Sequence, residues 1–271
     1  VEYEAMRNRR CAKARDSGVR AAALYGKLNN REGYESAARI AADMVEKLPK
    51  GSFADEVAWQ GFHHFRRYND WAGANRLGLR MIAKGLPLAK ERQALLHSYM
   101  SENYWRQGQR ANAVTAIARS RSIEDNRSRH KEHLDYLSGS QAKPGEMKPV
   151  VDDWAKKYPE SAGYATILLA YAHHNAEQND RAVDLLAQAL VPDADSHDAA
   201  RRVVDWLPNE PDANAKAERI LLDALQKNPE PIHKNRLRYA LALPLYRDRM
   251  KQENKARNMC RELVTKSPDN D

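Results

Sequence analysis

One pattern recurs seven times along the chain and limits what the chain can fold into. A first residue, Ala in six of the seven copies, is followed by small or apolar residues four and about seven positions later. Pro ends most copies. The first residues lie 36, 39, 34, 35, 35 and 39 positions apart, and they are Ala38, Ala74, Ala113, Met147, Ala182, Ala217 and Ala256. Such a period is typical of stacked units that bury their apolar faces only against their neighbours.

Each copy is predicted to be an amphipathic helix, because its apolar positions share one face at helical spacing. A second amphipathic segment precedes each copy, as in residues 53–67 and 90–106. The apolar stripes of these two segments are Val57, Gly61 and Phe65, and Leu96, Met100 and Tyr104. Asn and Gly between the segments predict tight turns, and the residue before a Pro is displaced from the helical region. The sequence therefore predicts an all-α fold of about seven helix pairs, without β-sheet.

These pairs resemble the tetratricopeptide repeat. The segments that carry the resemblance are Leu24-Tyr25-Gly26 with Gly33-Tyr34 and Ala38, then Tyr104, Gly108 and Ala113, then Ala182 with Ala189-Leu190, and Ala217 with Ala224-Leu225 and Pro229. The resemblance covers roughly residues 18–268. It implies a right-handed α-α superhelix, or solenoid, in which the first helix of each pair lines a concave wall.

The expected domain organisation follows from this register. Residues 1–17 are predicted to be a charged leading helix or cap, and residues 18–271 a tetratricopeptide-like solenoid. Gly139, Pro144 and Gly145 predict an irregular connection near 139–146. Pro208 and Pro211 predict another near 208–213.

Charge is unevenly distributed within the net +8 of the chain. Residues 1–150 contain 27 Lys and Arg against 17 Asp and Glu, whereas residues 151–200 contain 3 against 9. One interpretation is a solvated helical surface, and the other is attraction of an acidic partner by the basic first half. The acidic block interrupts any long phosphate track, so a nucleic acid is a disfavoured partner.

The resemblance places rings and charged side chains on the concave wall. The predicted ligand-binding residues are Trp59, His63, Arg66, Arg67, Tyr99, Glu102, Trp105, Arg106, Tyr136, Tyr171 and His174. Arg129, His133, Arg202 and Trp206 are expected on the same wall. Trp, Tyr and Arg are the side chains that most often dominate binding energy. The alternative for each ring is that it fills a gap between helix pairs.

Three functional hypotheses are consistent with such a wall. The first is a non-catalytic scaffold or adaptor that holds a protein segment, with Arg66, Arg67 and Arg106 meeting carboxylates. The second is a bacterial envelope module for glycan binding or exopolysaccharide export, with sugars stacked on Trp59, Trp105 and Trp206. The third is the helical arm of a larger cell-wall enzyme. Periplasm, cell envelope and cytoplasm all remain open as locations.

Signals of chemistry are weak in this sequence. It contains no HExxH, CxxC, GxSxG or GxxxxGK[ST] motif, so we expect no catalysis, no cofactor and no metal. His130 and His133 share a helix face, which we expect to be solvated. Cys11 and Cys260 are too far apart in an extended fold to form a disulfide. No run of about 18 apolar residues is present, so no membrane span is expected.

Overall fold

The computed structural model describes residues 20–28, 30–47, 55–190, 196–227 and 231–266. The described residues form helices and turns, with no strand among them, which confirms the predicted all-α class. The chain divides into two compact units, Val1–Glu132 and His133–Asp271. We call them unit 1 and unit 2. The predicted cap, residues 1–17, lies outside the described residues, and the right-handed superhelix stays a prediction.

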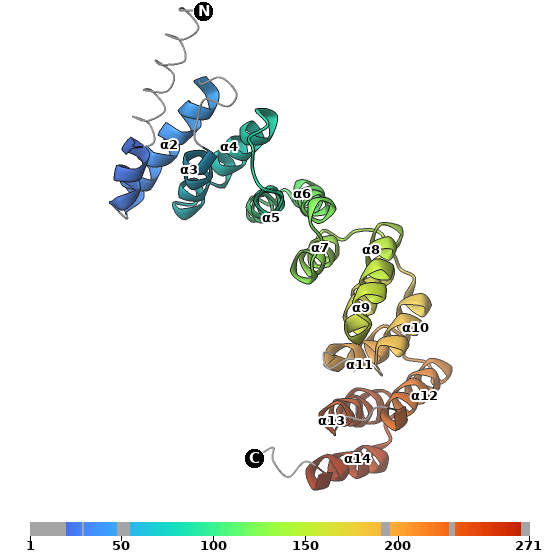
Figure 1. The fold of residues 1–271 in the computed structure, drawn as a ribbon. Coiled ribbons are helices and arrows are strands. Elements are labelled where there is room, and N and C mark those ends of the chain that lie inside the picture. The colour runs from blue at the N-terminus through green and yellow to red at the C-terminus, as the bar shows by residue number, and fades with distance from the viewer. Residues whose placement is uncertain (1–19, 29, 48–54, 191–195, 228–230, 267–271) are drawn as a thin grey trace, which may run out of the picture. The chain divides into compact units, whose positions relative to one another are not determined.

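Unit 1 is a series of helices that follow one another along the chain (Figure 1). Residues 20–27 form its first described helix. The helices that follow are α2 (Arg31–Lys47), α3 (Asp55–Arg67), α4 (Trp71–Ala83), α5 (Lys90–Arg106), α6 (Arg110–Ile123) and the first part of α7 (Arg127–Gly139). In this series α2 packs against α3, α3 against α4, α4 against α5 and α5 against α6.

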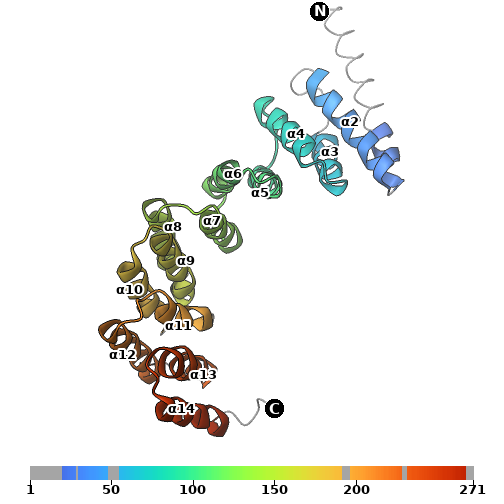
Figure 2. The ribbon, with the colours of Figure 1, turned by 180° about the vertical axis from the view of Figure 1, so that it is seen from behind.

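Unit 2 continues the series of helices from the last part of α7 (Figure 2). Its elements are α8 (Pro144–Lys157), the 3₁₀-helix η1 (Pro159–Ser161), α9 (Ala162–Asn175), α10 (Asn179–Ala189), α11 (Ser196–Asp205), α12 (Pro211–Lys227), α13 (Pro231–Ala240), the π-helix η2 (Leu241–Arg249) and α14 (Glu253–Lys266). The last pair therefore consists of α13 with η2, followed by α14.

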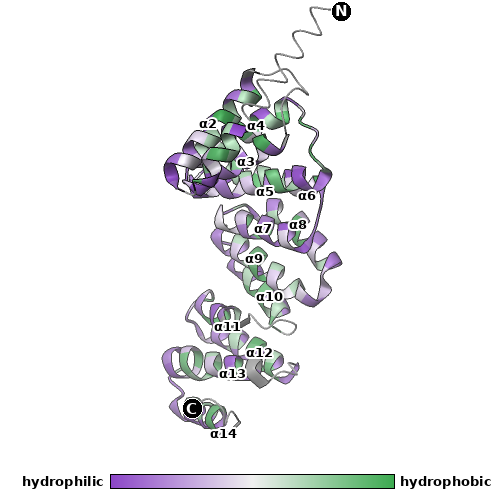
Figure 3. Ribbon diagram, turned by 60° about the vertical axis from the view of Figure 1, so that its left-hand side comes forward, coloured by the Kyte–Doolittle hydropathy of each residue, from purple (hydrophilic) through white to green (hydrophobic). Residues whose placement is uncertain are grey.

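The repeat register predicted from the sequence is confirmed by burial. Hydrophobic residues (green in Figure 3) alternate with hydrophilic ones along the helices, and the first residue of every copy lies on a buried face. These first residues are 0% exposed in the first six copies, and Ala256 in the seventh is 5% exposed. The seven copies are the second helices of the pairs, α2, α4, α6, α8, α10, α12 and α14.

The turns inside the pairs share one backbone solution. In five pairs the residue after the helix C-cap adopts positive φ, and these residues are Asn69, Gly108, Gln141, Glu177 and Lys251. Each of the first four of these turns has the two hydrogen bonds of a Schellman motif. In the first, the Asn69 N–H donates to the Arg66 carbonyl at 3.1 Å, and the Asp70 N–H donates to the Phe65 carbonyl at 2.9 Å. This turn reverses the chain within three or four residues and sets the antiparallel pairing.

The two connections predicted to be irregular are shorter than expected. The first consists of residues 140–143, because Gly139 still ends α7 and Pro144 already begins α8. Its last residue, Lys143, is the N-cap of α8 and its side chain makes no capping hydrogen bond. The Lys143 N–H donates to Glu146 Oε2 at 3.0 Å. The second consists of residues 206–210, because Pro211 begins α12. None of the described helices is long and apolar enough to cross a bilayer.

Candidate binding face

The first helices of two neighbouring pairs bring rings together in unit 1. Trp59 and His63 come from α3, and Tyr99 comes from α5. The Tyr99 ring centroid lies 6.2 Å from that of Trp59 and 5.2 Å from that of His63. All three side chains are half-buried. The structure thus unites three of the residues predicted for the wall, and we call them, with Arg66 and Glu102, the α3–α5 cluster.

Arg66 joins the two helices of this cluster. Its guanidinium carbon lies 4.3 Å from the Tyr99 ring centroid, and the guanidinium forms an ion pair with Glu102. Its Nε donates to Asn103 Oδ1 at 3.0 Å, and buried Asn103 in turn donates to Asn75 Oδ1 at 2.9 Å. The carboxylate that Arg66 meets therefore belongs to the same chain, and Arg66 positions α3 against α5.

Trp59 and His63 also border a groove on the other side of α3. Its volume is about 530 Å³, and it separates α3 from the helix of residues 20–27. We call it the α3 groove; its lining residues are Ala22, Ala23, Gly26, Lys27, Glu56, Trp59, Gln60, His63, His64 and Arg67. Arg67 is exposed and donates to the Tyr34 hydroxyl at 3.2 Å. Two first helices therefore flank an open groove with one aromatic wall.

The histidines of this groove are neutral near pH 7. Burial, together with the smaller effect of the nearby Arg66 and Arg67 charges, lowers the pKa of His63 to about 4. Burial also lowers the pKa of His64, with a contribution from Arg67. The groove therefore presents uncharged imidazole rings beside the cations Lys27 and Arg67.

The low pKa of His63 predicts acid destabilisation. His63 is neutral in the folded chain, whereas an unfolded histidine takes up a proton below about pH 6.5. Its contribution to the free energy of unfolding is therefore complete above that pH and is lost as pH falls towards 4. Urea unfolding followed by circular dichroism between pH 7.5 and 4 should show this loss, and His63→Gln should reduce it. An NMR titration of His63 with a midpoint near 6.5 would contradict the prediction.

Two further predicted residues lie at the end of α5. Arg106 forms an ion pair with Glu102 at 2.7 Å, and its guanidinium carbon lies 5.0 Å from the Trp71 ring centroid. Trp105 is half-buried, and the Arg110 guanidinium carbon lies 3.7 Å from its ring centroid. Arg106 is thus tied to the α3–α5 cluster through Glu102, and Trp105 lies against the start of α6.

Unit 2 contains a related arrangement on α9 and α11. Tyr171 donates its hydroxyl to Asp198, and the Arg202 guanidinium carbon lies 5.7 Å from the Tyr171 ring centroid. His174 stacks on Trp206 with 4.2 Å between ring centroids and 8° between ring planes. Tyr136, the remaining predicted residue, is half-buried on α7. A first-helix ring packed against Arg and a carboxylate thus recurs in both units.

The expected exposure of Trp206 is wrong. Trp206 is only 6% exposed. Trp206 directly follows the end of α11 at Asp205, and its ring packs against His174 and Tyr171. The position of a helix end depends on tertiary packing, so no local sequence signal marked this burial.

The side chains expected to be accessible on α7 are also buried. Arg129 is 6% exposed and pairs with Glu124 at 2.8 Å. His133 is 8% exposed, and His130 is fully buried with its Nδ1 3.1 Å from Arg121 Nη2. The expectation of a solvated His130 and His133 face is therefore wrong, because α7 buries this face.

Comparison with known proteins gives no family for the chain. No family model matches it, and neither does any curated protein. Among solved structures, the crystal structure of BtubC (BKLC) from P. vanneervenii is similar to it, with 12% sequence identity and a TM-score of 0.32. That alignment covers 95% of this chain and 91% of the other. A score of this size does not define a shared fold, so function must be inferred from the residues themselves.

Proposed function

We propose that the chain is a tetratricopeptide-like scaffold without catalytic activity, which holds a segment of another protein in the α3 groove. The observation that carries this proposal is the groove itself, about 530 Å³ between two first helices. Half-buried Trp59 and His63 form its ring wall, and Arg67 and Lys27 supply positive charge. Large half-buried rings next to cations are typical of binding hot spots.

The accessibility of the charged side chains at the groove supports a peptide with acidic side chains. Arg66 is mostly enclosed by Glu102 and Asn103. Arg67 is exposed and contacts the neutral side chain of Tyr34, through its hydroxyl at 3.2 Å and with the guanidinium carbon 5.1 Å from the ring centroid. A carboxylate of a bound segment would gain a charge-assisted hydrogen bond at Arg67. Glu56 is already occupied by Arg92 at 2.7 Å, so its charge opposes an acidic segment less.

A protein segment is favoured over a glycan by the fate of the tryptophans. Stacking of sugars was expected on Trp59, Trp105 and Trp206, but Trp206 is buried against His174. The Trp59 ring is also in contact with the His63 ring, whose centroid lies 4.8 Å from that of Trp59. The three tryptophans therefore do not form a row of open ring faces on which successive sugars could stack.

The test is a selection of peptides followed by measurement on variants. A random peptide library displayed on phage is selected against the full chain, and recovered peptides are measured by calorimetry. We expect Trp59→Ala to weaken binding by about 2 kcal/mol, as for a hot-spot ring. Arg67→Glu should weaken it without loss of helicity, because Arg67 is exposed.

The matched control for these variants is Leu79→Asp on α4, a residue that is 50% exposed and not part of the groove lining. It should leave peptide binding unchanged. Peptides that bind Trp59→Ala and Arg67→Glu as tightly as the wild-type chain, but lose affinity for Leu79→Asp, would place the binding face on the second helices and overturn the proposal.

A further inference from the structure

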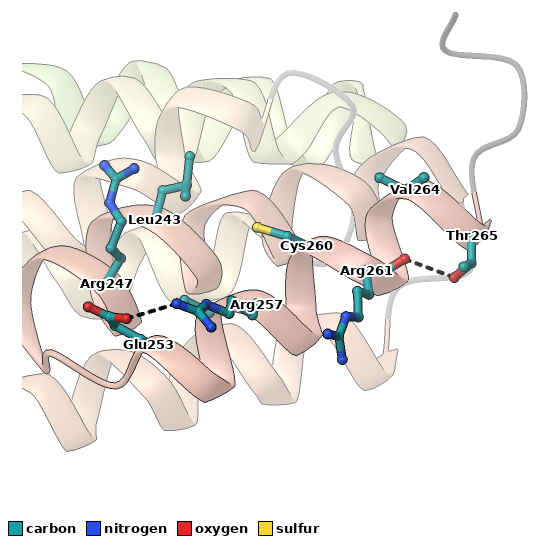
Figure 4. A pocket seen from close by; sticks show the side chains of 9 residues that line it. Leu243, Arg247, Glu253, Arg257, Cys260, Arg261, Val264 and Thr265 are labelled. Atoms are coloured by element: carbon teal, nitrogen blue, oxygen red, sulfur yellow. Dashed lines mark hydrogen bonds and ion pairs between the residues drawn. The ribbon is translucent and has the colours of Figure 1, made fainter.

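A second groove lies between η2 and α14, in the last helix pair of unit 2 (Figure 4). Its volume is about 680 Å³. We call it the η2–α14 groove; its lining residues are Leu243, Arg247, Glu253, Ala256, Arg257, Cys260, Arg261, Val264 and Thr265. Figure 4 shows Leu243 and Arg247 on one helix and the other side chains at the start of and along α14.

The floor of this groove is apolar and incompletely covered. Val264 is 76% exposed, and Leu243 and Cys260 are half-buried. In earlier copies of the repeat, the residue about seven positions after the first is almost fully buried. Met81 is 0% exposed and Ala224 is 2% exposed. The corresponding residue of α14, Leu263, is only half-buried. The last pair therefore leaves an apolar strip without a neighbour among the described residues.

The π-helix η2 supports a role for this strip. Pro244 lies inside η2 and lacks an N–H, so the regular α-helical ladder is interrupted there. The chain stays helical in a wider turn, with the Met250 N–H donating to the Leu245 carbonyl at 2.8 Å. Leu241, Ala242, Leu245 and Tyr246 remain buried, while Leu243 and Arg247 line the groove. Such π-turns are rare and occur frequently at functional sites.

The rim of the groove is positively charged. Arg247, Arg257 and Arg261 line it against one acidic residue, Glu253. Glu253 pairs with Arg257 at 3.2 Å, and Arg247 pairs with Asp248 at 2.6 Å. Within the part of the chain that the structure describes, Arg261 forms no ion pair. An occupant with carboxylates beside an apolar stripe would match both the floor and the rim.

We propose that the η2–α14 groove binds an acidic amphipathic helix of another protein. The lining extends from Glu253 to Thr265 along α14, which corresponds to about 18 Å or three helical turns. The apolar stripe of the partner helix would cover Leu243, Cys260 and Val264, and its acidic flank would face the arginines. This site is separate from the α3 groove, so the inference stands or fails independently of the proposed function.

The test uses a synthetic peptide and the full chain with Cys11→Ser, so that Cys260 is its one thiol. The peptide forms about three helical turns, with Leu at i, i+3, i+4 and i+7 and Glu on the flanks. A matched peptide carries Lys in place of Glu. Fluorescence anisotropy should show binding of the acidic peptide alone, weakened by salt. Bound peptide should also slow the reaction of Cys260 with a thiol reagent.

Variants locate this binding. Val264→Asp and the double variant Arg257→Glu/Arg261→Glu should each weaken it about tenfold or more. These side chains are exposed, so circular dichroism should be unchanged. Arg181→Glu, an exposed charge reversal on α10, is the matched control and should have little effect.

Four results would overturn the inference. They are absence of acidic-peptide binding, equal binding of the Lys peptide, equal weakening by Arg181→Glu, and protection of Cys260 by phosphatidylserine vesicles but not by the peptide. If sedimentation shows that the wild-type chain is a dimer and that Val264→Asp makes it monomeric, the groove binds a second copy of the chain instead, which also overturns the inference.

Discussion

Replacing Gly61 with Ala is expected to destabilise unit 1 by about 3 kcal/mol. A Cβ atom on Gly61 would lie 2.2 Å from the Ala41 Cβ and 3.5 Å from Leu77 Cδ2. Neither Cβ can rotate away, because both are fixed to helix backbones. The helices α2 and α3 must therefore separate, which loosens the buried contacts of Ala41 and of Phe62 nearby.

The sign of this effect distinguishes it from helix propensity. At an open helical position, Gly→Ala stabilises a protein by up to about 1 kcal/mol. Gly145 in α8 is the matched control, because nothing lies within 4 Å of a Cβ added there. Chemical unfolding followed by circular dichroism should show a lower free energy of unfolding for Gly61→Ala and no decrease for Gly145→Ala. A stabilised Gly61→Ala variant would mean that α2 and α3 cross less closely than described.

The sequence was sufficient to predict the positions that such contacts use. Gly61 was placed on the packing stripe of its helix with Val57 and Phe65, and the structure buries all three. Ala182 and Ala217, which begin two copies of the repeat, are fully buried. A periodic pattern is local information, because each helix buries one face against its neighbours, and so it specifies the buried face without knowledge of the partner.

Turn geometry was predictable only where the residue type signals it. Asn69 and Gly108 are residues that adopt positive φ readily, and Asn and Gly between the helical segments predicted tight turns. Gln141 and Glu177 adopt the same geometry without such a signal. The flanking helices impose it, because both turns close with Schellman hydrogen bonds.

The residues of the candidate site were predictable only in part. The resemblance to the tetratricopeptide repeat placed Trp59, His63 and Tyr99 on one wall, and the structure brings their rings together. The internal ion pair of Arg66 and Glu102 depends on how two first helices lie side by side. Spacing within either helix contains no such information, so the enclosure of Arg66 was not foreseen.

Trp154→Ala is expected to have the largest effect on unit 2, a loss of about 3–5 kcal/mol in the free energy of unfolding. Trp154 is 2% exposed and is among the largest fully buried side chains described. Its ring packs against Tyr158 and Tyr164, with centroids 4.6 and 6.0 Å away. Its Nε1 also donates to the Ser161 carbonyl at 2.8 Å, which holds η1 between α8 and α9.

Two further variants separate the cavity from the hydrogen bond. Trp154→Phe keeps an aromatic ring but leaves the Ser161 carbonyl without this donor, so it should cost about 1–3 kcal/mol. Trp105→Ala removes a ring that is only half-buried, and it should cost less than Trp154→Ala. Urea unfolding followed by circular dichroism gives all three values. A buried ring at the third position of the fourth copy must stabilise the fold more than a half-buried ring on a first helix. An equal decrease in the free energy of unfolding for Trp154→Ala and Trp105→Ala would therefore show that the fourth copy does not pack through Trp154.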